Sequence, residues 1–323
     1  MSLLNVSAVS KKNGEEYLLN NIHFIQQHSQ KIAIAGSTGS GKTTLLKIIA
    51  GLIQPDEGEI LLEGKRVKGP SEKLLPGHPQ IAYLSQDFEL RANYRVIEIL
   101  EIANKLSDPE AAQVYEICRI DHLLKRWSDE LSGGERQRIA FAKALVTFPK
   151  LLLLDEPFSN LDAIHKSILK SILTDIEEQF NITCVLVSHD PVDLLSWAHE
   201  IIVLSQGKII QRGSPKEVYF HPLNEYVAAL FGAFIISPDL VQLFPSLEID
   251  GRRFIRPWDF EISYEKKGIQ GKIETVKFMG GYFETEVSLS KSKLIIMMNR
   301  HFESGRTVYV SLRQIEEQGP HLE

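Results

Sequence analysis

Residues 31–53 read KIAIAGSTGSGKTTLLKIIAGLI, and they decide the fold class. The first part, KIAIAG at 31–36, is a short apolar run that ends in glycine, as expected of a buried strand. A loop rich in glycine and serine follows it. The last part, TTLLKIIAGLI, spaces its apolar residues as a buried helix does. The stretch therefore predicts a strand, a tight loop and a helix, in that order.

Two later apolar runs predict further strands of the same sheet. Residues 151–155 read LLLLD without apolar–polar alternation, which suits a strand buried on both faces of a parallel sheet. Residues 183–189, TCVLVSH, form the next run. Apolar residues at helical spacing lie between the two runs: Ile164, Ile168, Leu169, Ile172, Leu173 and Ile176. This order predicts an α/β domain with right-handed crossovers, and residues from about 87 to 140 predict a helical subdomain.

The loop GSTGSGKT at 36–43 has the composition of a phosphate cradle. Glycines let the backbone wrap tightly, so that successive N–H groups point at phosphate oxygens, and the helix that follows adds its positive N-terminal end. In this arrangement Lys42 reaches the β- and γ-phosphates and the hydroxyl of Thr43 ligates Mg²⁺. A chance match is the alternative, but the loop lies between a predicted strand and a predicted helix, as the mechanism requires. The predicted ATP-binding residues here are Gly36, Ser37, Thr38, Gly39, Ser40, Gly41, Lys42, Thr43 and Thr44.

Asp155 and Glu156 lie at the end of the predicted strand LLLLD. Carboxylates at the carboxyl end of a parallel strand face the ligand crevice of such a sheet. Because neighbouring side chains diverge, we assign Asp155 to Mg²⁺ and Glu156 to activation of the attacking water. A solvated strand end is the alternative, but the four leucines before the pair and Pro157 after it favour the catalytic interpretation.

Residues 131–138, LSGGERQR, predict the capped start of a helix. Ser132 is placed to be the N-cap and Glu135 falls at the third helical position, which together form a capping box. Gly133 and Gly134 leave the first turn without side chains, and a bare, capped helix N-terminus attracts anions. A structural cap without a ligand is the alternative for this segment taken alone.

The order of these motifs resembles that of the ATPase subunit of ABC transporters. LSGGE at 131–135 carries the resemblance, because it stands between the GSTGSGKT loop and the LLLLDEP strand, and the likeness spans essentially the whole chain. It implies an ABC-type P-loop ATPase domain. It also implies that the helix start at 132–135 completes the ATP site of the opposite subunit.

The resemblance assigns roles to further residues. Gln86, after the predicted strand IAYLS, resembles the glutamine that binds Mg²⁺ at the ATP site and senses the membrane partner. Residues 159–162, SNLD, resemble the D-loop, which ends here at Asp162. His189 resembles the histidine that contacts the γ-phosphate. The predicted catalytic residues are thus Glu156, His189 and Lys42, and the predicted Mg²⁺ ligands are Thr43, Gln86 and Asp155.

One position departs from the family's pattern. The family usually has an aromatic residue near position 13, where it stacks on adenine, but this chain has Asn13. Tyr17 is nearby and falls in the next predicted strand. We predict that adenine stacking is weaker in this chain or is supplied by Tyr17. A register error of a few residues is the alternative.

The chain changes character after about residue 236. Ser237-Pro238-Asp239 predicts a linker between an ATPase domain at 1–236 and a small all-β domain at 237–323. Gly280-Gly281 predicts a hairpin turn within that second domain. The alternating segments that predict its strands are KIETVKF at 272–278, YFETEVSL at 282–289, KLIIMM at 293–298 and TVYVSL at 307–312.

The tail resembles the OB-like TOBE domain of importers for iron, polyamines, sulfate, molybdate or sugars. Residues 213–232 resemble the end of the ATPase domain of bacterial importers, and residues 256–259, RPWD, with the hairpin that follows, resemble the TOBE domain. A β-rich dimerisation appendage is the alternative. The resemblance implies an importer, with iron or a polyamine as the cargo hypothesis, but no residue names the cargo or a ligand of the tail.

Composition limits the kind of protein. With 43% hydrophobic and 24% charged residues over 323 positions, the chain is typical of a globular protein with one large and one small domain. Its net charge of −6 argues against a nucleic-acid partner. Cys118 and Cys184 lack metal-ligand spacing. The start of the chain does not resemble a signal peptide, and no run approaches the roughly 18 apolar residues that cross a bilayer. We expect a peripheral protein on the cytoplasmic face of the membrane.

The resemblance also implies partners. We expect a head-to-tail homodimer that encloses two ATP molecules, integral membrane permease subunits and a solute-binding protein. A small P-loop kinase has no use for LSGGE. Soluble ABC proteins that act on ribosomes or DNA usually carry two ATPase cassettes or long coiled coils. An exporter ATPase with a β-rich regulatory tail is the remaining alternative, but most exporters lack a tail of this length, so we expect an importer.

Overall fold

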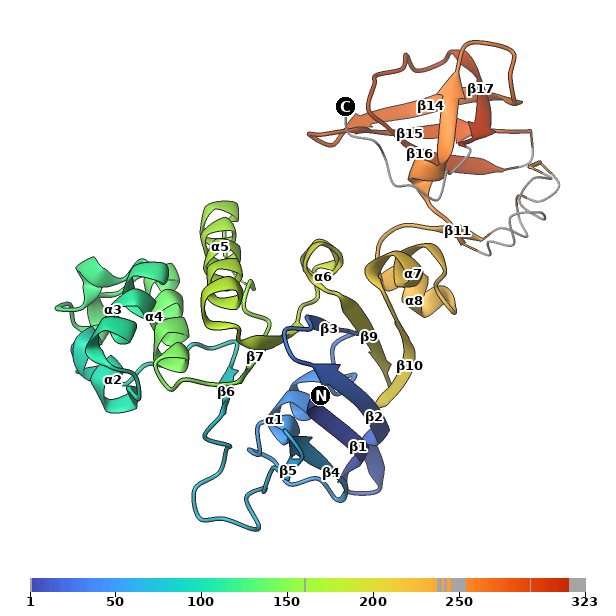
Figure 1. Ribbon diagram of the computed structural model, residues 1–323. Coiled ribbons are helices and arrows are strands. Elements are labelled where there is room, and N and C mark those ends of the chain that lie inside the picture. Colours follow the sequence, from blue (N-terminus) through green and yellow to red (C-terminus); the bar gives the residue numbers. More distant parts are fainter. Residues whose placement is uncertain are drawn as a thin grey trace. The chain divides into compact units, whose positions relative to one another are not determined.

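The structure is a computed structural model, and it describes residues 2–159, 161–236, 240, 243–244, 254–290 and 292–313 (Figure 1). Asn160 of the predicted D-loop and the predicted linker Ser237-Pro238-Asp239 lie outside the described residues. The chain divides into two compact units, Met1–Val218 and Tyr219–Glu323. The domain boundary that we place at 236/237 stays a prediction.

A six-stranded sheet, as far as the described residues go, forms the centre of the first unit, in the order β10-β9-β3-β8-β7-β6. Its strands are β3 (Ile32–Ala35), β6 (Ile81–Leu84), β7 (Leu151–Asp155), β8 (Thr183–Val187), β9 (Glu200–Ser205) and β10 (Lys208–Gly213). Neighbouring strands are parallel except for β9 and β10. Every residue of β3, β7 and β8 is buried, which confirms the three strands predicted from uninterrupted apolar runs.

A second, antiparallel sheet covers the N-terminal part of this unit, in the order β2-β1-β4-β5. Its strands are β1 (Ser2–Asn13), β2 (Glu16–Gln27), β4 (Glu57–Leu62) and β5 (Lys65–Arg66). One apolar core joins the two sheets to α1 (Lys42–Ile49), with Val6 and Phe24 from one sheet, Ile34 from the other and Leu45 from the helix. Burial of these side chains is the main force that holds α1, and therefore the loop before it, against both sheets.

Helices complete the first unit. The predicted helical region contains α2 (Val96–Ala103), α3 (Asp108–Ile117) and α4 (Gly133–Leu145), with 3₁₀ turns at Asp121–Leu123 and Ser128–Glu130; Figure 1 shows these helices grouped together. The other helices are α5 (Ala163–Phe180), α6 (Pro191–Trp197) and α7 (Pro215–Phe220), the last of which crosses the division between the units. The apolar face of α5 is buried from Leu169 to Ile176, whereas Ile164 in its first turn is 72% exposed. None of the described helices has the length and apolar character needed to cross a membrane.

The second unit is dominated by a curled antiparallel sheet of order β13-β17-β14-β15-β16. Its strands are β13 (Phe260–Ser263), β14 (Ile269–Phe278), β15 (Phe283–Ser288), β16 (Lys293–Met298) and β17 (Thr307–Leu312); α8 (Glu225–Leu230) and the short pair β11 (Ile235–Ile236) and β12 (Phe254–Ile255) complete the unit. The two edge strands, β13 and β16, contact each other, so the sheet curls around its own apolar core. These strands confirm the predicted small all-β, OB-like domain, and β14 and β15 form the hairpin predicted at Gly280-Gly281.

A buried arginine organises the start of the second unit. Arg256 is 2% exposed, and its guanidinium donates hydrogen bonds to the backbone oxygens of Tyr219, Ala228, Gly232 and Ala233. Its own backbone N–H donates to Asp259 at 2.9 Å. The RPWD motif at 256–259 therefore has a structural reason: one side chain satisfies four carbonyls, one in α7, one in α8 and two just after α8.

Candidate functional site

The predicted phosphate cradle lies between β3 and α1. Gly41 is the N-cap of α1 with a φ of +103°, and a Cβ placed on it would lie 2.7 Å from the backbone oxygen of Leu18. Only glycine satisfies both conditions without strain. The outer residues Ser37, Thr38 and Gly39 are exposed, whereas Gly36 and Ser40 are buried. The loop thus turns its tip to solvent while its base packs against β2.

Lys42 and Thr43 open α1 at the base of the loop, and Thr44 follows them half-buried. The Lys42 side chain is buried, and its Nζ donates to the backbone oxygens of Gly36 and Ser37, each at 2.8 Å. The ammonium is therefore held at the mouth of the cradle. Thr43 Oγ1 donates to Asp155 Oδ1 at 3.2 Å, which joins the loop to the end of β7.

Asp155 ends β7 and is 4% exposed. Its second oxygen, Oδ2, accepts a hydrogen bond from the hydroxyl of Tyr83 in β6 at 2.8 Å. Burial and the nearby Asp155 charge raise the pKa of Tyr83, so its hydroxyl stays protonated and acts as a donor. No sequence motif predicts a role for Tyr83. Its only signal is its place in the apolar run that precedes Gln86.

Glu156 turns away from Asp155 toward β8. Its φ of +52° is left-handed, and its N–H donates to the Val187 oxygen at 2.9 Å. Its carboxylate Oε2 lies 3.1 Å from His189 Nδ1, and the His189 side chain is 68% exposed. A left-handed non-glycine residue costs on the order of 1 kcal/mol, and such strain concentrates at functional positions. The predicted water-activating residue and the predicted γ-phosphate contact are thus direct neighbours.

Gln86 lies two residues beyond β6, and its side chain is exposed. Because β6 is parallel to β7 with Leu84 opposite Leu154, Gln86 follows its strand at the same edge of the sheet as Asp155. The cradle follows β3, Glu156 follows β7 and His189 follows β8, so the carboxyl ends of four parallel strands bring these predicted residues together.

The predicted signature segment begins α4 and forms the capping box. Ser132 Oγ accepts from the Glu135 N–H at 3.4 Å, and Glu135 Oε2 accepts from the Ser132 N–H at 2.8 Å. The Ser132 N–H is the main cause that holds the pKa of Glu135 below its usual value. A Cβ on Gly133 would meet no atom within 4 Å, whereas one on Gly134 would lie 2.5 Å from the His165 ring.

The signature segment is not part of the edge that carries the cradle. Over the described part of the chain, the hydrogen bonds and ion pairs of the Ser132 and Glu135 side chains are made with each other and with Arg126. Asp162, the end of the predicted D-loop, is the N-cap of α5 and accepts from the His165 N–H at 2.9 Å. The backbone N–H of His165 is the main cause that lowers the pKa of Asp162. His165 therefore touches both the signature helix and the D-loop residue.

The oxygen ligands at this edge fit Mg²⁺. The described residues contain no group of three or more His, Cys, Asp or Glu side chains that would form a metal cage by themselves. They do contain the Thr43 hydroxyl and the Asp155 carboxylate, hydrogen-bonded to each other beside the cradle. Mg²⁺ is commonly held by one or two carboxylates together with substrate phosphates and water, so this donor set suits it.

The described residues also form hollows outside the cradle. A groove of about 330 Å³ runs between β6 and α4 in the first unit, and Tyr83, Phe88, Lys143 and Ala144 are among its lining residues. Burial lowers the pKa of Lys143 in its wall.

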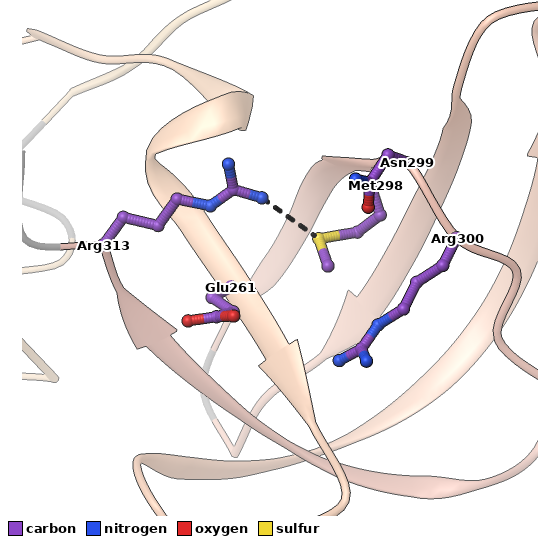
Figure 2. A pocket seen from close by; sticks show the side chains of 5 residues that line it. All are labelled: Glu261, Met298, Asn299, Arg300 and Arg313. Carbon is purple, nitrogen blue, oxygen red and sulfur yellow. Dashed lines mark hydrogen bonds between the residues drawn. The ribbon is translucent and has the colours of Figure 1, made fainter. Parts of the chain in front are cut away.

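Another hollow belongs to the second unit. It is a pocket of about 670 Å³ bordered by Glu261, Met298, Asn299, Arg300 and Arg313 (Figure 2). Arg300 donates to the Ile262 oxygen at 2.9 Å, and Arg313 contacts Met298 Sδ at 4.0 Å. No predicted site residue lines this pocket.

Comparison with known proteins matches residues 19–159 to the family described as ABC transporter. The chain is 31% identical to the sulfate/thiosulfate import ATP-binding protein CysA of Synechococcus elongatus, over 91% of this chain and 88% of that protein. It is 30% identical to the spermidine/putrescine import ATP-binding protein PotA of Clostridium acetobutylicum, over 95% and 93%. It is 32% identical to the glucose import ATP-binding protein GlcV of Saccharolobus solfataricus, over 96% of each chain.

Solved structures share the fold of the first unit. The ATP-binding cassette MJ0796, in a dimeric post-hydrolysis state bound to ADP and Pi, matches with a TM-score of 0.57 and 26% identity over 66% of this chain and 98% of that chain. The ADP conformation of the ABC transporter cassette MJ1267 matches with a TM-score of 0.59 and 25% identity over 72% and 98%.

Substitutions at two glycines of the cradle distinguish the cost of a close packing contact from the cost of backbone strain. We expect Gly41→Ala to lower the free energy of unfolding by about 3 kcal/mol, because it adds a collision with Leu18 to the cost of a left-handed φ. Gly39→Ala is the matched control: its φ is +81°, but its Cβ would meet no atom within 4 Å, so a loss of about 1 kcal/mol is expected. Denaturant unfolding without nucleotide measures both, and equal losses would contradict the packing argument.

Proposed function

Because this chain belongs to the importer-type ATP-binding subunits of ABC transporters, we propose that its own residues divide the hydrolysis of ATP between two half-sites. The activity is hydrolysis of ATP to ADP and phosphate, which energises an importer. The single observation that carries the residue assignment is the convergence of Thr43–Asp155 and Glu156–His189 at one edge of the parallel sheet.

The first half-site binds the triphosphate. Backbone N–H groups of residues 36–41 and the N-terminal end of α1 receive the phosphates, and Lys42 supplies a positive charge that is already held at the mouth of the cradle. Thr43, Asp155 and Gln86 would hold Mg²⁺, which supplies charge neutralisation for the β- and γ-phosphate oxygens when bound. These residues position the γ-phosphate, and catalysis then depends mainly on orientation and charge.

Glu156 and His189 act on the far side of the γ-phosphate. The Glu156 carboxylate orients the attacking water and accepts its proton. His189, 3.1 Å from that carboxylate, is exposed and therefore free to contact the γ-phosphate. Support for these roles comes from the left-handed backbone of Glu156, which separates its carboxylate from the Asp155 side chain.

The second half-site serves a partner copy. The bare, capped N-terminus of α4 at 132–135 attracts anions but makes no described contact with the cradle of its own chain. Two copies that meet head to tail about a two-fold axis would place each such helix against the other's ATP. The dimeric structure of the similar cassette MJ0796, bound to ADP and Pi, supports this homodimer.

The membrane partners are proposed to dock at the groove beside Gln86. Residues of β6 and α4 line much of that groove, and its lining residues Ser85 and Phe88 lie on either side of Gln86 in the sequence. We place the chain on the cytoplasmic face, bound to integral permease subunits that work with a solute-binding protein. The relatives are named as import proteins for sulfate, polyamines and glucose, which favours import over the exporter and soluble alternatives. Iron or a polyamine as the cargo stays a prediction.

Removing the water-activating carboxylate tests the catalytic assignment. We expect Glu156→Gln to form a stable ATP-bound dimer whose turnover is lower by roughly 100-fold or more, because binding is kept while proton transfer is lost. Light scattering in ATP and Mg²⁺ and phosphate release measure the two properties. Glu178→Gln, an exposed change in α5, is the control. A Glu156→Gln chain that stays monomeric, or that hydrolyses ATP normally, would contradict the catalytic role of Glu156.

Tyr17 is proposed to stack on adenine. Tyr17 lies in β2 and is 41% exposed. The next residue, Leu18, lies close to Gly41 of the cradle through its backbone oxygen. Lys12 Nζ lies 4.6 Å from the centroid of the Tyr17 ring. We expect Tyr17→Ala to weaken ATP binding by up to about ten-fold, while Tyr17→Phe, which keeps the ring, binds as the native chain does. Calorimetry measures both. If Tyr17→Ala binds ATP with unchanged affinity, Tyr17 does not stack on adenine.

The groove is tested by filling it. Ala144→Arg places a long side chain in the groove, so we expect the permease subunits to be lost from the purified complex while ATP binding is retained. Ala112→Arg, an exposed change in α3, is the matched control and should keep the complex intact. Full retention of the permease by Ala144→Arg would show that docking occurs elsewhere.

A further inference from the structure

Tyr83 lies next to the proposed Mg²⁺ ligand Asp155 but has no assigned role. It lies in β6 opposite Leu153 of β7, so its side chain and that of Asp155, two residues further on, project from the same face of the sheet. Diagonal neighbours at this spacing are within reach of a long aromatic side chain. The Tyr83 hydroxyl donates to Asp155 Oδ2 at 2.8 Å.

The Asp155 carboxylate is held from two sides. Oδ2 accepts from Tyr83 at 2.8 Å and Oδ1 accepts from Thr43 at 3.2 Å. Each oxygen therefore has a hydroxyl donor, one from α1 and one from β6, and together they fix the carboxylate plane. At 4% exposure, Asp155 depends on these donors to replace water.

The Tyr83 ring is itself anchored. It packs against the main apolar core of the first unit, and it forms part of the wall of the groove between β6 and α4. Its hydroxyl donates a hydrogen bond to the Asp155 carboxylate at 2.8 Å. A rigid ring with a permanent donor suits the task of orienting a ligand of a metal ion.

We propose that Tyr83 is a positioning residue for the ATPase reaction: its hydroxyl holds Asp155 in the orientation in which that carboxylate receives Mg²⁺. The proposal rests on the metal role proposed for Asp155. It explains why a polar tip occurs in the buried strand IAYL, where an apolar residue would pack as well. It also places one of the two supports of the Mg²⁺ ligand in the wall of the groove, in addition to Thr43 at the base of the cradle.

The test measures how binding of a non-hydrolysable ATP analogue depends on free Mg²⁺, with the full-length chain. We expect Tyr83→Phe to weaken the apparent Mg²⁺ affinity by roughly ten- to hundred-fold, the usual effect of losing a hydrogen-bond partner of a metal ligand. Binding of the analogue in EDTA should stay unchanged, because the cradle is untouched. Tyr115→Phe is the matched control: Tyr115 is a buried tyrosine in α3 whose hydroxyl makes no hydrogen bond within the described residues, so its removal should change neither value.

Asp155→Asn separates failure of this proposal from failure of the metal assignment. If Asp155→Asn loses the Mg²⁺ dependence and Tyr83→Phe keeps it, Tyr83 does not position the ligand and the proposal is overturned while the metal role stands. If Asp155→Asn keeps the Mg²⁺ dependence, both the metal role and the proposal fall. If Tyr83→Phe loses binding in EDTA as well, its hydroxyl supports the fold rather than the metal ligand, and the proposal is again overturned.

Discussion

Asp155 is buried at the end of β7, and a carboxylate in that position is stable only if hydrogen bonds replace the water it has lost. The two donors come from different elements, Thr43 from the first turn of α1 and Tyr83 from β6. Satisfying one side chain therefore fixes a helix and a strand against the same strand end. Because the phosphate cradle leads directly into α1, its base takes its position from the same contacts.

The parallel order of β3, β8, β7 and β6 then determines which other residues meet there. The segments that follow these strands all emerge at one edge, which brings Glu156 to His189 and places Gln86 at the same edge. The signature segment follows no strand of this sheet and begins α4 instead. One chain thus carries both the residues proposed to bind ATP and a separate anion-attracting helix end, and in the proposed two-fold dimer each helix end would face the nucleotide of the partner copy.

Much of this was predictable from local patterns. Buried parallel strands leave uninterrupted apolar runs, so β3, β7 and β8 were visible, and the Ser132–Glu135 capping box was readable because its partners are three residues apart. Contacts between elements were not. Tyr83 looks like an ordinary strand residue, since nothing in the linear order says that β6 pairs with β7 in the register that places it diagonal to Asp155. Ile164 fits the apolar spacing of α5, yet it lies in the first turn, beyond the buried face.

The two glycines of the signature segment also show that contacts between elements cannot be predicted from local sequence. Gly133 and Gly134 look equivalent in LSGGE, but a side chain on Gly133 would meet open space whereas one on Gly134 would collide with His165. The absence of a side chain at Gly133 therefore leaves space that a ligand could occupy. At Gly134, a side chain is excluded because α5 packs against this position. His165 also bonds to Asp162, the N-cap of α5, so the close approach that Gly134 permits ties the signature helix to the D-loop within one subunit. A glycine in a motif can thus be required by the ligand, by the fold, or by the joint between two functional segments.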